Sequence, residues 1–481
     1  MAGSSVAQDK DQSSRLTGSI VVVALVSAIS GLLYGYDTGI ISGALLQITD
    51  EFGLADSMKQ VIAAAILLGA VIGALTCSRL SESHGRRKTL LLVAAVFVVG
   101  ALWAALAPNA VMLIGGRLVL GFAVGGATQT APIYVAELSP TKYRGRLVLF
   151  FQIAIGVGIV ISTIVGATEV VDWRIAVGAA SVPAALMLVM LLRLPESPRW
   201  LTKTGDVEGA RSAFERVRPH GSDVGPELDE IREAVAAEEE QSTRGWRGLR
   251  EAWVRPALVV GCGVAIFTQL SGIEMIIYYS PTILTDNGFS KSAALDVSVG
   301  LGITYLVTQL IGLAIIDRVG RRRLTLITLP GAALALIVLG TFFVTGNDGP
   351  AQVPYIIATL IAFMAFTAGG IQLMGWLTGS EIYPLATRAA GAAAQSASLW
   401  GTNLLITLTL LTIINAIGTG QTFWLYAGFN VIAFVVLWRK MPELTGRSLE
   451  QIESNLRAGK FTPADFAKQS SDESVASPER R

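Results

Sequence analysis

Long apolar runs alternate with short polar stretches along most of the chain. A helix needs about 20 apolar residues to cross the hydrocarbon core of a bilayer. Charged residues, Gly, Pro and Asn divide the pattern into twelve such runs, which predicts an all-α polytopic membrane protein. The predicted spans are 19–41, 60–80, 90–107, 111–135, 147–168, 174–193, 257–284, 295–316, 324–345, 353–379, 389–416 and 421–438.

The pattern turns hydrophilic between residues 193 and 257. Apolar residues recur there at helical spacing over 207–217 and 228–235, and Trp246, Leu249 and Trp253 indicate a third short helix at the membrane interface. We therefore expect a helical linker between two bundles. The predicted domains are an N-terminal tail (1–18), a six-helix bundle (19–193), the linker (194–256), a second six-helix bundle (257–440) and a polar C-terminal tail (441–481) whose end is disordered.

Lysine and arginine cluster after alternate spans. Examples are Arg86, Arg87 and Lys88 after the second span, and Arg321 to Arg323 after the eighth. Positively charged loops face the cytoplasm, so we expect both termini and the linker to be cytoplasmic in a multi-pass protein of the plasma membrane.

The composition excludes several classes of function. Hydrophobic residues make up 52% of the chain and charged residues 15%, with a formal net charge of +1, so we expect the lipid bilayer and no nucleic acid as a partner. Cys77 and Cys262 each lie in a predicted span, which favours packing roles over a disulfide. We find no P-loop, zinc motif or nucleophile constellation, and we therefore predict neither an enzyme nor a metal or cofactor site. We expect a monomer.

Two segments of the first half recur in the second half. Residues 82–87 (ESHGRR) match 317–322 (DRVGRR), and 137–144 (ELSPTKYR) match 381–388 (EIYPLATR). Both pairs lie at span ends on the side predicted to be cytoplasmic, so the halves have the same orientation. Parallel halves with a substrate site near the midplane are typical of major facilitator transporters.

One carboxylate, Asp37, interrupts a stretch that carries no other charge from residue 19 to 46. An ionised Asp at the centre of a bilayer costs roughly 2.5–3.5 kcal/mol on insertion scales. The sequence therefore predicts a partner or a function for Asp37.

Several short motifs occur in a fixed order around these features. They are Gly35-Tyr36-Asp37-Thr38-Gly39, Gly85-Arg86-Arg87, Gly116-Arg117, Pro195-Glu196-Ser197-Pro198-Arg199-Trp200, Gln269-Leu270-Ser271-Gly272, Tyr278-Tyr279-Ser280-Pro281 and Pro442-Glu443-Leu444-Thr445. With these motifs the chain resembles the sugar porter family of the major facilitator superfamily over about residues 31–448. The resemblance implies a fold of twelve transmembrane helices in two halves.

The resemblance places Asp37 in the proton-coupled branch of the family, with Arg117 in the fourth span as its partner. A guanidinium nearby stabilises the carboxylate, whereas burial away from it favours the neutral acid. A conformational change that alters their contact would thus change proton affinity. The alternative is a static ion pair that holds the first and fourth helices together.

The resemblance also implies a hydroxyl-binding site. Amides offer a donor and an acceptor to a pair of hydroxyls, and an indole offers a flat apolar face to a sugar ring. The positions that match this pattern are Gln152, Gln269, Trp376 and Trp400, with Asn403 one turn beyond Trp400.

Other positions depart from the family. Thr268 and Glu274 stand where the seventh span usually has Gln and Asn, Thr304 and Tyr305 stand near the usual eighth-span Asn, and Gln372-Leu373 replaces Gly-Pro before Trp376. We include Thr268, Glu274 and Tyr305 among the expected substrate-binding residues. A smaller polyol, a cyclitol or a different sugar therefore stays open as the substrate. Glu274 could also be a solvated carboxylate near the extracellular mouth.

The family further implies a cytoplasmic gate of ion pairs that closes when the site faces outward. For the extra arginines Arg322 and Arg323, the alternative is topology alone. The expected gate residues are Glu82, Arg86, Arg87, Glu137, Arg144, Asp317, Arg321, Glu381 and Arg388.

The function that we predict is proton-coupled symport of a sugar or polyol by alternating access, with protons and the small-molecule substrate as partners. One alternative is a proton-independent uniporter, in which Asp37 and Arg117 are only structural. The other is a sugar sensor on a transporter scaffold.

Overall fold

The computed structural model describes residues 17–140, 143–168, 171–219, 221–240, 245–346, 351–445, 447 and 449–466. Every regular element in these ranges is helical. Twelve helical segments among them are long and apolar enough to cross a membrane. The prediction of an all-α protein with twelve spans is confirmed.

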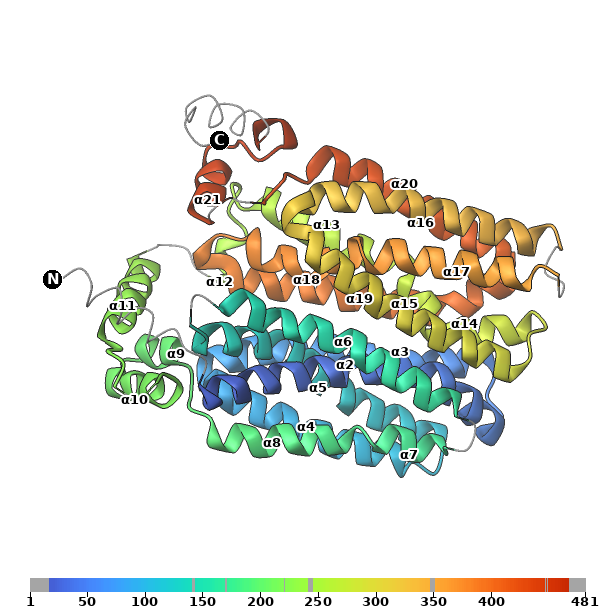
Figure 1. The fold of residues 1–481 in the computed structure, drawn as a ribbon, viewed down its shortest axis with the longest axis horizontal. Helices are drawn as coiled ribbons and strands as arrows, with labels where there is room; N and C mark the ends of the chain where they lie inside the picture. Colours follow the sequence, from blue (N-terminus) through green and yellow to red (C-terminus); the bar gives the residue numbers. More distant parts are fainter. Residues whose placement is uncertain are drawn as a thin grey trace. The chain divides into compact units, whose positions relative to one another are not determined.

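The chain forms two compact units, residues 1–242 (unit 1) and 243–481 (unit 2). In Figure 1, α9, α10 and α11 of unit 1 lie at one end of its longer helices, which we call the linker end. The helices of unit 1 are α2 (Gly18–Phe52), α3 (Asp56–His84), α4 (Arg86–Ala105), α5 (Ala110–Leu138), α6 (Arg144–Ala167), α7 (Trp173–Gly178), α8 (Ser181–Arg193), α9 (Pro198–Lys203), α10 (Val207–Val217) and α11 (Gly225–Glu240).

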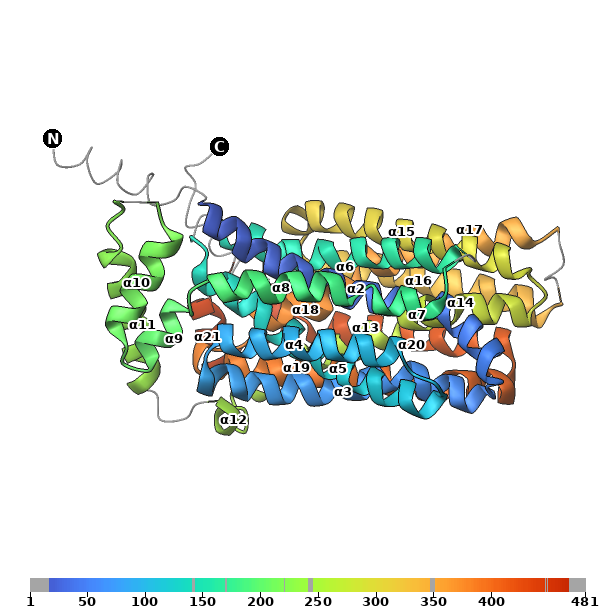
Figure 2. The same cartoon turned by 90° about the horizontal axis from the view of Figure 1, so that it is seen from below.

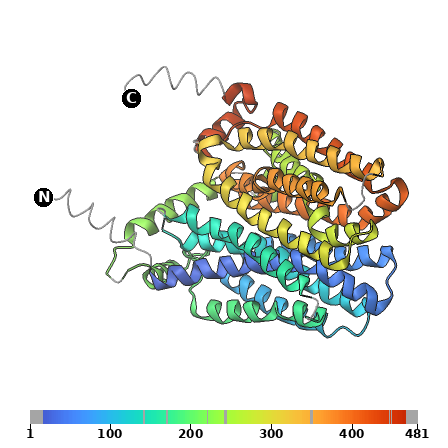
Figure 3. The ribbon, with the colours of Figure 1, turned by 45° about the vertical axis from the view of Figure 1, so that its right-hand side comes forward.

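The long helices of unit 2, coloured from yellow-green to red, run alongside one another in Figure 3. We call the end at which α15 and α20 finish the tail end, because the C-terminal residues follow from it. The helices of unit 2 are α12 (Gly245–Gly248), α13 (Arg255–Leu270), α14 (Ile273–Asp286), α15 (Lys291–Val319), α16 (Arg321–Val344), α17 (Val353–Ala368), α18 (Ile371–Glu381), the 3₁₀ helix η1 (Leu385–Thr387), α19 (Arg388–Ile417), α20 (Thr419–Lys440) and α21 (Leu449–Arg457).

The same helix pairs form within each unit. In unit 1, α2 packs on α6, α3 on α5 and α4 on α8. In unit 2, α13 packs on α19, α15 on α17 and α16 on α20. Counted along the chain, both units therefore pair their first span with the fifth, the second with the fourth and the third with the sixth, as the sequence repeat suggests.

Glycine sets how closely α2 approaches α6. A Cβ at Gly35 would overlap the carbonyl oxygen of Ile155, and one at Gly31 would overlap that of Phe151. The two backbones can touch only because these positions lack side chains, which is the usual role of small residues between membrane helices.

Another glycine, Gly272, interrupts the seventh span. The backbone of Gly272 has a φ of 96°, which disfavours other residues, and it separates α13 from α14. Asn430 of α20 donates to the carbonyl of Ser271 at 2.9 Å, so the freed backbone oxygen at the break is satisfied. This break determines where the residues that follow it lie.

The first part of the linker, α9 to α11, packs against the long helices of unit 1. Arg218 donates to the carbonyl of Leu138 at 2.8 Å, and Thr17 at the start of α2 donates to that of Val217 at 2.7 Å. Figure 2 shows α9, α10 and α11 at the same end of the unit from a second direction. The helices predicted over 207–217 and 228–235 are present as α10 and α11. The third predicted helix is only the short α12, and Trp253 lies beyond it.

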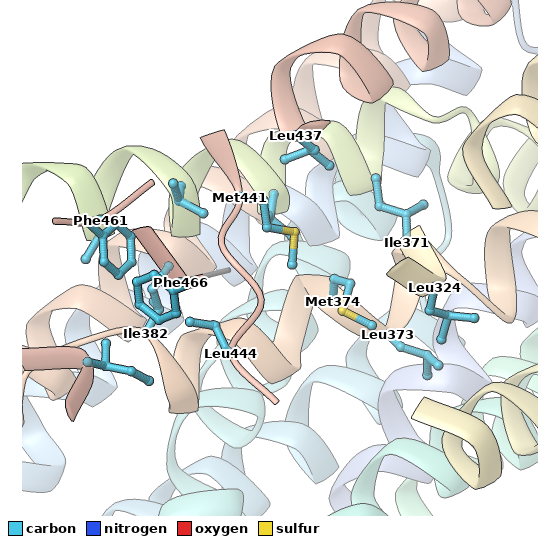
Figure 4. Packing of buried hydrophobic residues seen from close by; sticks show 14 of the residues in the cluster. Leu324, Ile371, Leu373, Met374, Ile382, Leu437, Met441, Leu444, Phe461 and Phe466 are labelled. Carbon is cyan, nitrogen blue, oxygen red and sulfur yellow. The ribbon is translucent and has the colours of Figure 1, made fainter. Parts of the chain in front are cut away.

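The described part of the C-terminal tail packs onto unit 2. Phe461 and Phe466 meet edge to face, with ring centroids 5.7 Å apart, beside Ile382 and Leu444 in the apolar cluster of Figure 4. Helix α21 adds Ile452 to this cluster. Helix α21 was not predicted, because the tail is polar overall and its few apolar residues form one face only when the segment is helical.

Candidate functional site

Asp37 and Arg117 lie together inside unit 1. Asp37 of α2 is 6% exposed and Arg117 of α5 is 1% exposed. Arg117 Nη2 lies 3.8 Å from Asp37 Oδ2, and Arg117 Nε donates to the carbonyl of Ile62 in α3 at 2.7 Å. The Nη2 atom has no hydrogen-bond partner among the described residues. The pair is therefore electrostatic without a direct hydrogen bond, since 3.8 Å exceeds hydrogen-bond length.

Gln152 is the other candidate in unit 1. It lies on α6, the helix that packs against α2, and is 8% exposed. Its Nε2 finds no acceptor among the described residues. A buried amide that lacks a partner is costly, so this donor is available to a ligand hydroxyl.

In unit 2, Thr268 and Gln269 end α13 just before the glycine break. The hydroxyl of Thr268 donates to the carbonyls of Val264 at 2.8 Å and Ile371 at 3.2 Å, so it ties α13 to α18. Gln269 is fully buried, and neither atom of its amide has a partner among the described residues. Thr268 is thus occupied by the protein, whereas Gln269 is free to bind a hydroxyl.

Tyr305 of α15 is the centre of a second polar group. Gln309 donates to its hydroxyl at 3.5 Å, Gln372 of α18 interacts with the same hydroxyl, and Glu274 acts on it electrostatically. Glu274 is 2% exposed, which does not fit a solvated carboxylate. The unpaired oxygens of this group are Glu274 Oε2, Gln309 Oε1 and Gln372 Oε1.

The aromatic candidates also meet. The rings of Trp376 in α18 and Trp400 in α19 lie edge to face, with centroids 6.1 Å apart. Asn403 is fully buried and accepts a hydrogen bond from Thr407 at 3.2 Å, whereas its Nδ2 has no partner among the described residues. Indole faces and amides of this kind match the chemistry of a polyhydroxylated ring.

At the linker end of unit 1, Arg86 holds Glu137 through two hydrogen bonds, of 2.9 and 3.1 Å. The hydroxyl of Ser197 donates to the same carboxylate at 2.5 Å. Glu196 accepts from the backbone amide of Arg87 at 2.9 Å, at the first turn of α4.

The tail end of unit 2 repeats this geometry. Arg321 holds Glu381 through bonds of 3.2 and 3.0 Å and also pairs with Asp317 at 2.8 Å. Glu443 accepts from the backbone amides of Arg321 at 2.9 Å and Arg322 at 3.1 Å, at the first turn of α16. Burial raises the pKa of the Glu381 carboxyl, and the Arg321 guanidinium opposes this effect.

The remaining expected gate residues are not part of these pairs. Glu82 is exposed, and none of the ion pairs between described residues includes it. The guanidinium of Arg87 donates to the carbonyls of Leu191 and Leu192, and that of Arg388 to the carbonyl of Tyr383. The side chain of Arg144 lies outside the described structure.

Four residues of these ends were not among the expected gate residues, namely Glu196, Ser197, Glu443 and Thr445, whose hydroxyl donates to Glu443 at 2.7 Å. Their motifs were visible as Pro-Glu-Ser-Pro and Pro-Glu-Leu-Thr, each just after the last span of its half. The available signal was a glutamate a few residues after the last span of a half whose earlier turn carries Gly-Arg-Arg. Gln309 was also missed, and its position in the eighth span was the only indication.

Twelve apolar helices in two units that repeat the same helix pairs, with buried amides in each unit, are typical of membrane transporters. The family model for sugar (and other) transporters matches residues 23–456. The chain belongs to the sugar porter family of the major facilitator superfamily.

Named relatives cover nearly the whole chain. The major myo-inositol transporter IolT of Bacillus subtilis is 35% identical over 91% of this chain and 94% of its own length. The D-xylose transporter of Levilactobacillus brevis is 37% identical over 91% and 95%, and the galactose-proton symporter of Escherichia coli is 33% identical over 91% and 94%. The solved structure of the xylose transporter XylE from E. coli, in a partially occluded inward open conformation, matches with a TM-score of 0.77 and 26% identity, over 90% of this chain and all of that one.

Proposed function

We propose that this protein is a proton-coupled symporter of a sugar or polyol, in which Asp37 and Arg117 couple proton binding to alternating access. The Asp37–Arg117 pair carries the proposal. Both of its side chains are less than a tenth exposed, 1% for Arg117 and 8% for Asp37. Its 3.8 Å separation leaves Arg117 Nη2 unsatisfied, so the pair has not formed the strong contact expected of a static brace.

Proton binding to Asp37 would remove its attraction to Arg117. A buried guanidinium without a partner is costly, so neutralising Asp37 changes which arrangement of α2 and α5 is the more stable. A buried charge is tolerated in a membrane protein when it is neutralised or paired. Coupling would follow because protonation of Asp37 and the change in its contact with Arg117 depend on each other. The names of three related transporters, for galactose with protons, D-xylose and myo-inositol, support the same function and solute class.

The substrate would bind to the amides and indoles described above, of which Gln152, Gln269 and Asn403 have unsatisfied buried atoms. The Arg86–Glu137 and Arg321–Glu381 pairs would belong to the cytoplasmic gate, with both termini in the cytoplasm and the protein in the plasma membrane as a monomer. The positive charges at these ends support that orientation.

Uptake into proteoliposomes tests the proposal, with D-xylose, D-galactose and myo-inositol as probes. For one proton per solute, a pH gradient of one unit supports up to about tenfold accumulation, because one unit is worth 1.36 kcal/mol. Asp37→Asn should lose this accumulation and keep solute exchange, whereas Asp296→Asn, at an exposed carboxylate of α15, should keep both.

Other outcomes assign the alternatives. Wild-type uptake that only equilibrates the solute, whatever the pH gradient, would identify a uniporter. Measurable binding without flux would identify a sensor.

A further inference from the structure

Glu274 lies at an unusual place in unit 2. It is the second residue of α14, directly after the break at Gly272, and is 2% exposed. Its Oε2 atom has no hydrogen-bond partner among the described residues. An ionised carboxylate without a partner is strongly disfavoured inside a membrane span, whereas a neutral acid is disfavoured much less.

The surroundings of Glu274 supply no balancing charge. None of the ion pairs between described residues includes Glu274. Helices α13, α15, α17 and α19 pack against α14, α16 and α20 line a small cavity with it, and Tyr426 of α20 lies beside the break at Gly272. The charges of α16 lie within its first three residues and those of α20 within its last two. Helix α17 has no charged residue, α13 and α19 have one arginine each at their first residue, and the charges of α15 lie within its first six and last three residues. The titratable group that faces Glu274 is the Tyr305 hydroxyl.

The polar group around Tyr305 contains acceptors that lack donors. Glu274 Oε2, Gln309 Oε1 and Gln372 Oε1 have no hydrogen-bond partner among the described residues. An excess of acceptors needs donors, which solute hydroxyls and a protonated carboxyl both provide. A neutral carboxyl has one donor and one acceptor, as an amide does.

We infer that Glu274 binds the transported solute as a neutral carboxylic acid, so that solute affinity has a second pH dependence, separate from that of Asp37. This inference rests on the proposed function in that unit 2 binds a hydroxylated solute. It adds a proton site in unit 2 that controls binding, whereas Asp37 controls coupling.

Solute affinity measured against pH tests the inference. The Asp37→Asn background removes the other proton site, and exchange in that background reports affinity for D-xylose, D-galactose or myo-inositol. Affinity should fall about tenfold per pH unit once Glu274 loses its proton. With Glu274→Gln added, affinity should change less than about twofold over the same range. Glu274→Leu, which can neither donate nor accept, should bind the solute at least about tenfold more weakly than Glu274→Gln at every pH. An unchanged pH dependence in the Asp37→Asn/Glu274→Gln protein would overturn the inference.

Infrared spectroscopy gives a second readout that needs no solute. Purified protein at neutral pH should show the C=O stretch of a buried carboxylic acid, which Glu274→Gln removes and Asp37→Asn/Asp296→Asn does not. If Glu274→Gln instead removes a carboxylate band, Glu274 is ionised and the inference is refuted. Glu274→Asn provides the same comparison should the Gln variant fail to fold.

The two proposals fail separately. Accumulation retained by Asp37→Asn would contradict the coupling role of Asp37 and leave the Glu274 measurements unaffected. Conversely, a flat pH profile in the Asp37→Asn background, with accumulation lost, would contradict only the role of Glu274.

Discussion

Unit 1 and unit 2 close one end of their bundles with the same groups, an arginine and two glutamates. Arg86, Glu137 and Glu196 do this in unit 1, and Arg321, Glu381 and Glu443 in unit 2. The middles of the two units differ. Unit 1 buries an aspartate beside an arginine, whereas unit 2 buries amides, indoles and one carboxyl without a cation.

This difference indicates that the two halves of the repeat have different roles. The repeated ends serve a need common to both halves, which is to cap the helices and hold the turn between the second and third spans. The centres carry different side chains, although both units form the same helix pairs. We infer that unit 1 carries the coupling charge and that unit 2 carries most of the solute contacts.

The largest expected effect concerns packing of the first span of each unit. Gly35→Ala should destabilise the protein by about 3 kcal/mol, because its Cβ would overlap the Ile155 carbonyl oxygen in the adjacent backbone. Gly263→Ala on α13, where a Cβ meets nothing within 4 Å, is the matched control and should be neutral or slightly stabilising. Thermal unfolding of the purified variants measures both. Equal losses would show that the two units pack their first spans alike.

The next effect compares the arginine pairs. Glu137→Gln should cost about 3 kcal/mol, because both partners are 11% exposed and the bond from Ser197 is also weakened. Glu381→Gln should cost about 1–2 kcal/mol, since Glu381 is 25% exposed. Denaturant titration of each variant gives the two values. Asp317→Asn, at a side chain 79% exposed, should change stability by less than about 0.5 kcal/mol. A larger stability loss for Glu381→Gln than for Glu137→Gln would contradict the inference that the less exposed Arg86–Glu137 pair contributes more to stability.

The smallest effect concerns the capping carboxylates. Glu196→Ala and Glu443→Ala each remove a carboxylate from the first turn of a helix and should cost about 1 kcal/mol. Because the geometry is the same in both units, the two losses should agree within about 0.5 kcal/mol. Melting temperatures of the two single variants test this agreement. A large loss in only one of them would show that the ends are not equivalent.

Sequence alone was enough for the twelve spans, because apolar length is a strong signal in a membrane protein. Arg86, Glu137, Arg321 and Glu381 were all among the expected gate residues, but the sequence did not indicate which of these residues pair. Asp37 was conspicuous as a lone charge, and its partner Arg117 followed from the family resemblance.

The rest needed three-dimensional contacts. Glu196 and Glu443 lie more than a hundred residues from the amides that they cap, so no local pattern connects them. The burial of Glu274 depends on the break at Gly272 and on Tyr305 and Gln372 from other helices. The tail helix α21 depends on the apolar surface that unit 2 offers it.

The distance along the chain between each turn and its cap has a consequence for synthesis. Glu196 is 109 residues beyond Arg87, and Glu443 is 122 residues beyond Arg321. At roughly 5–20 residues per second, each turn between second and third spans waits about 5–25 s for its carboxylate. A half-made bundle is thus uncapped at that turn until its sixth span has been synthesised, so the segment after the sixth span of each half completes the turn between its second and third spans.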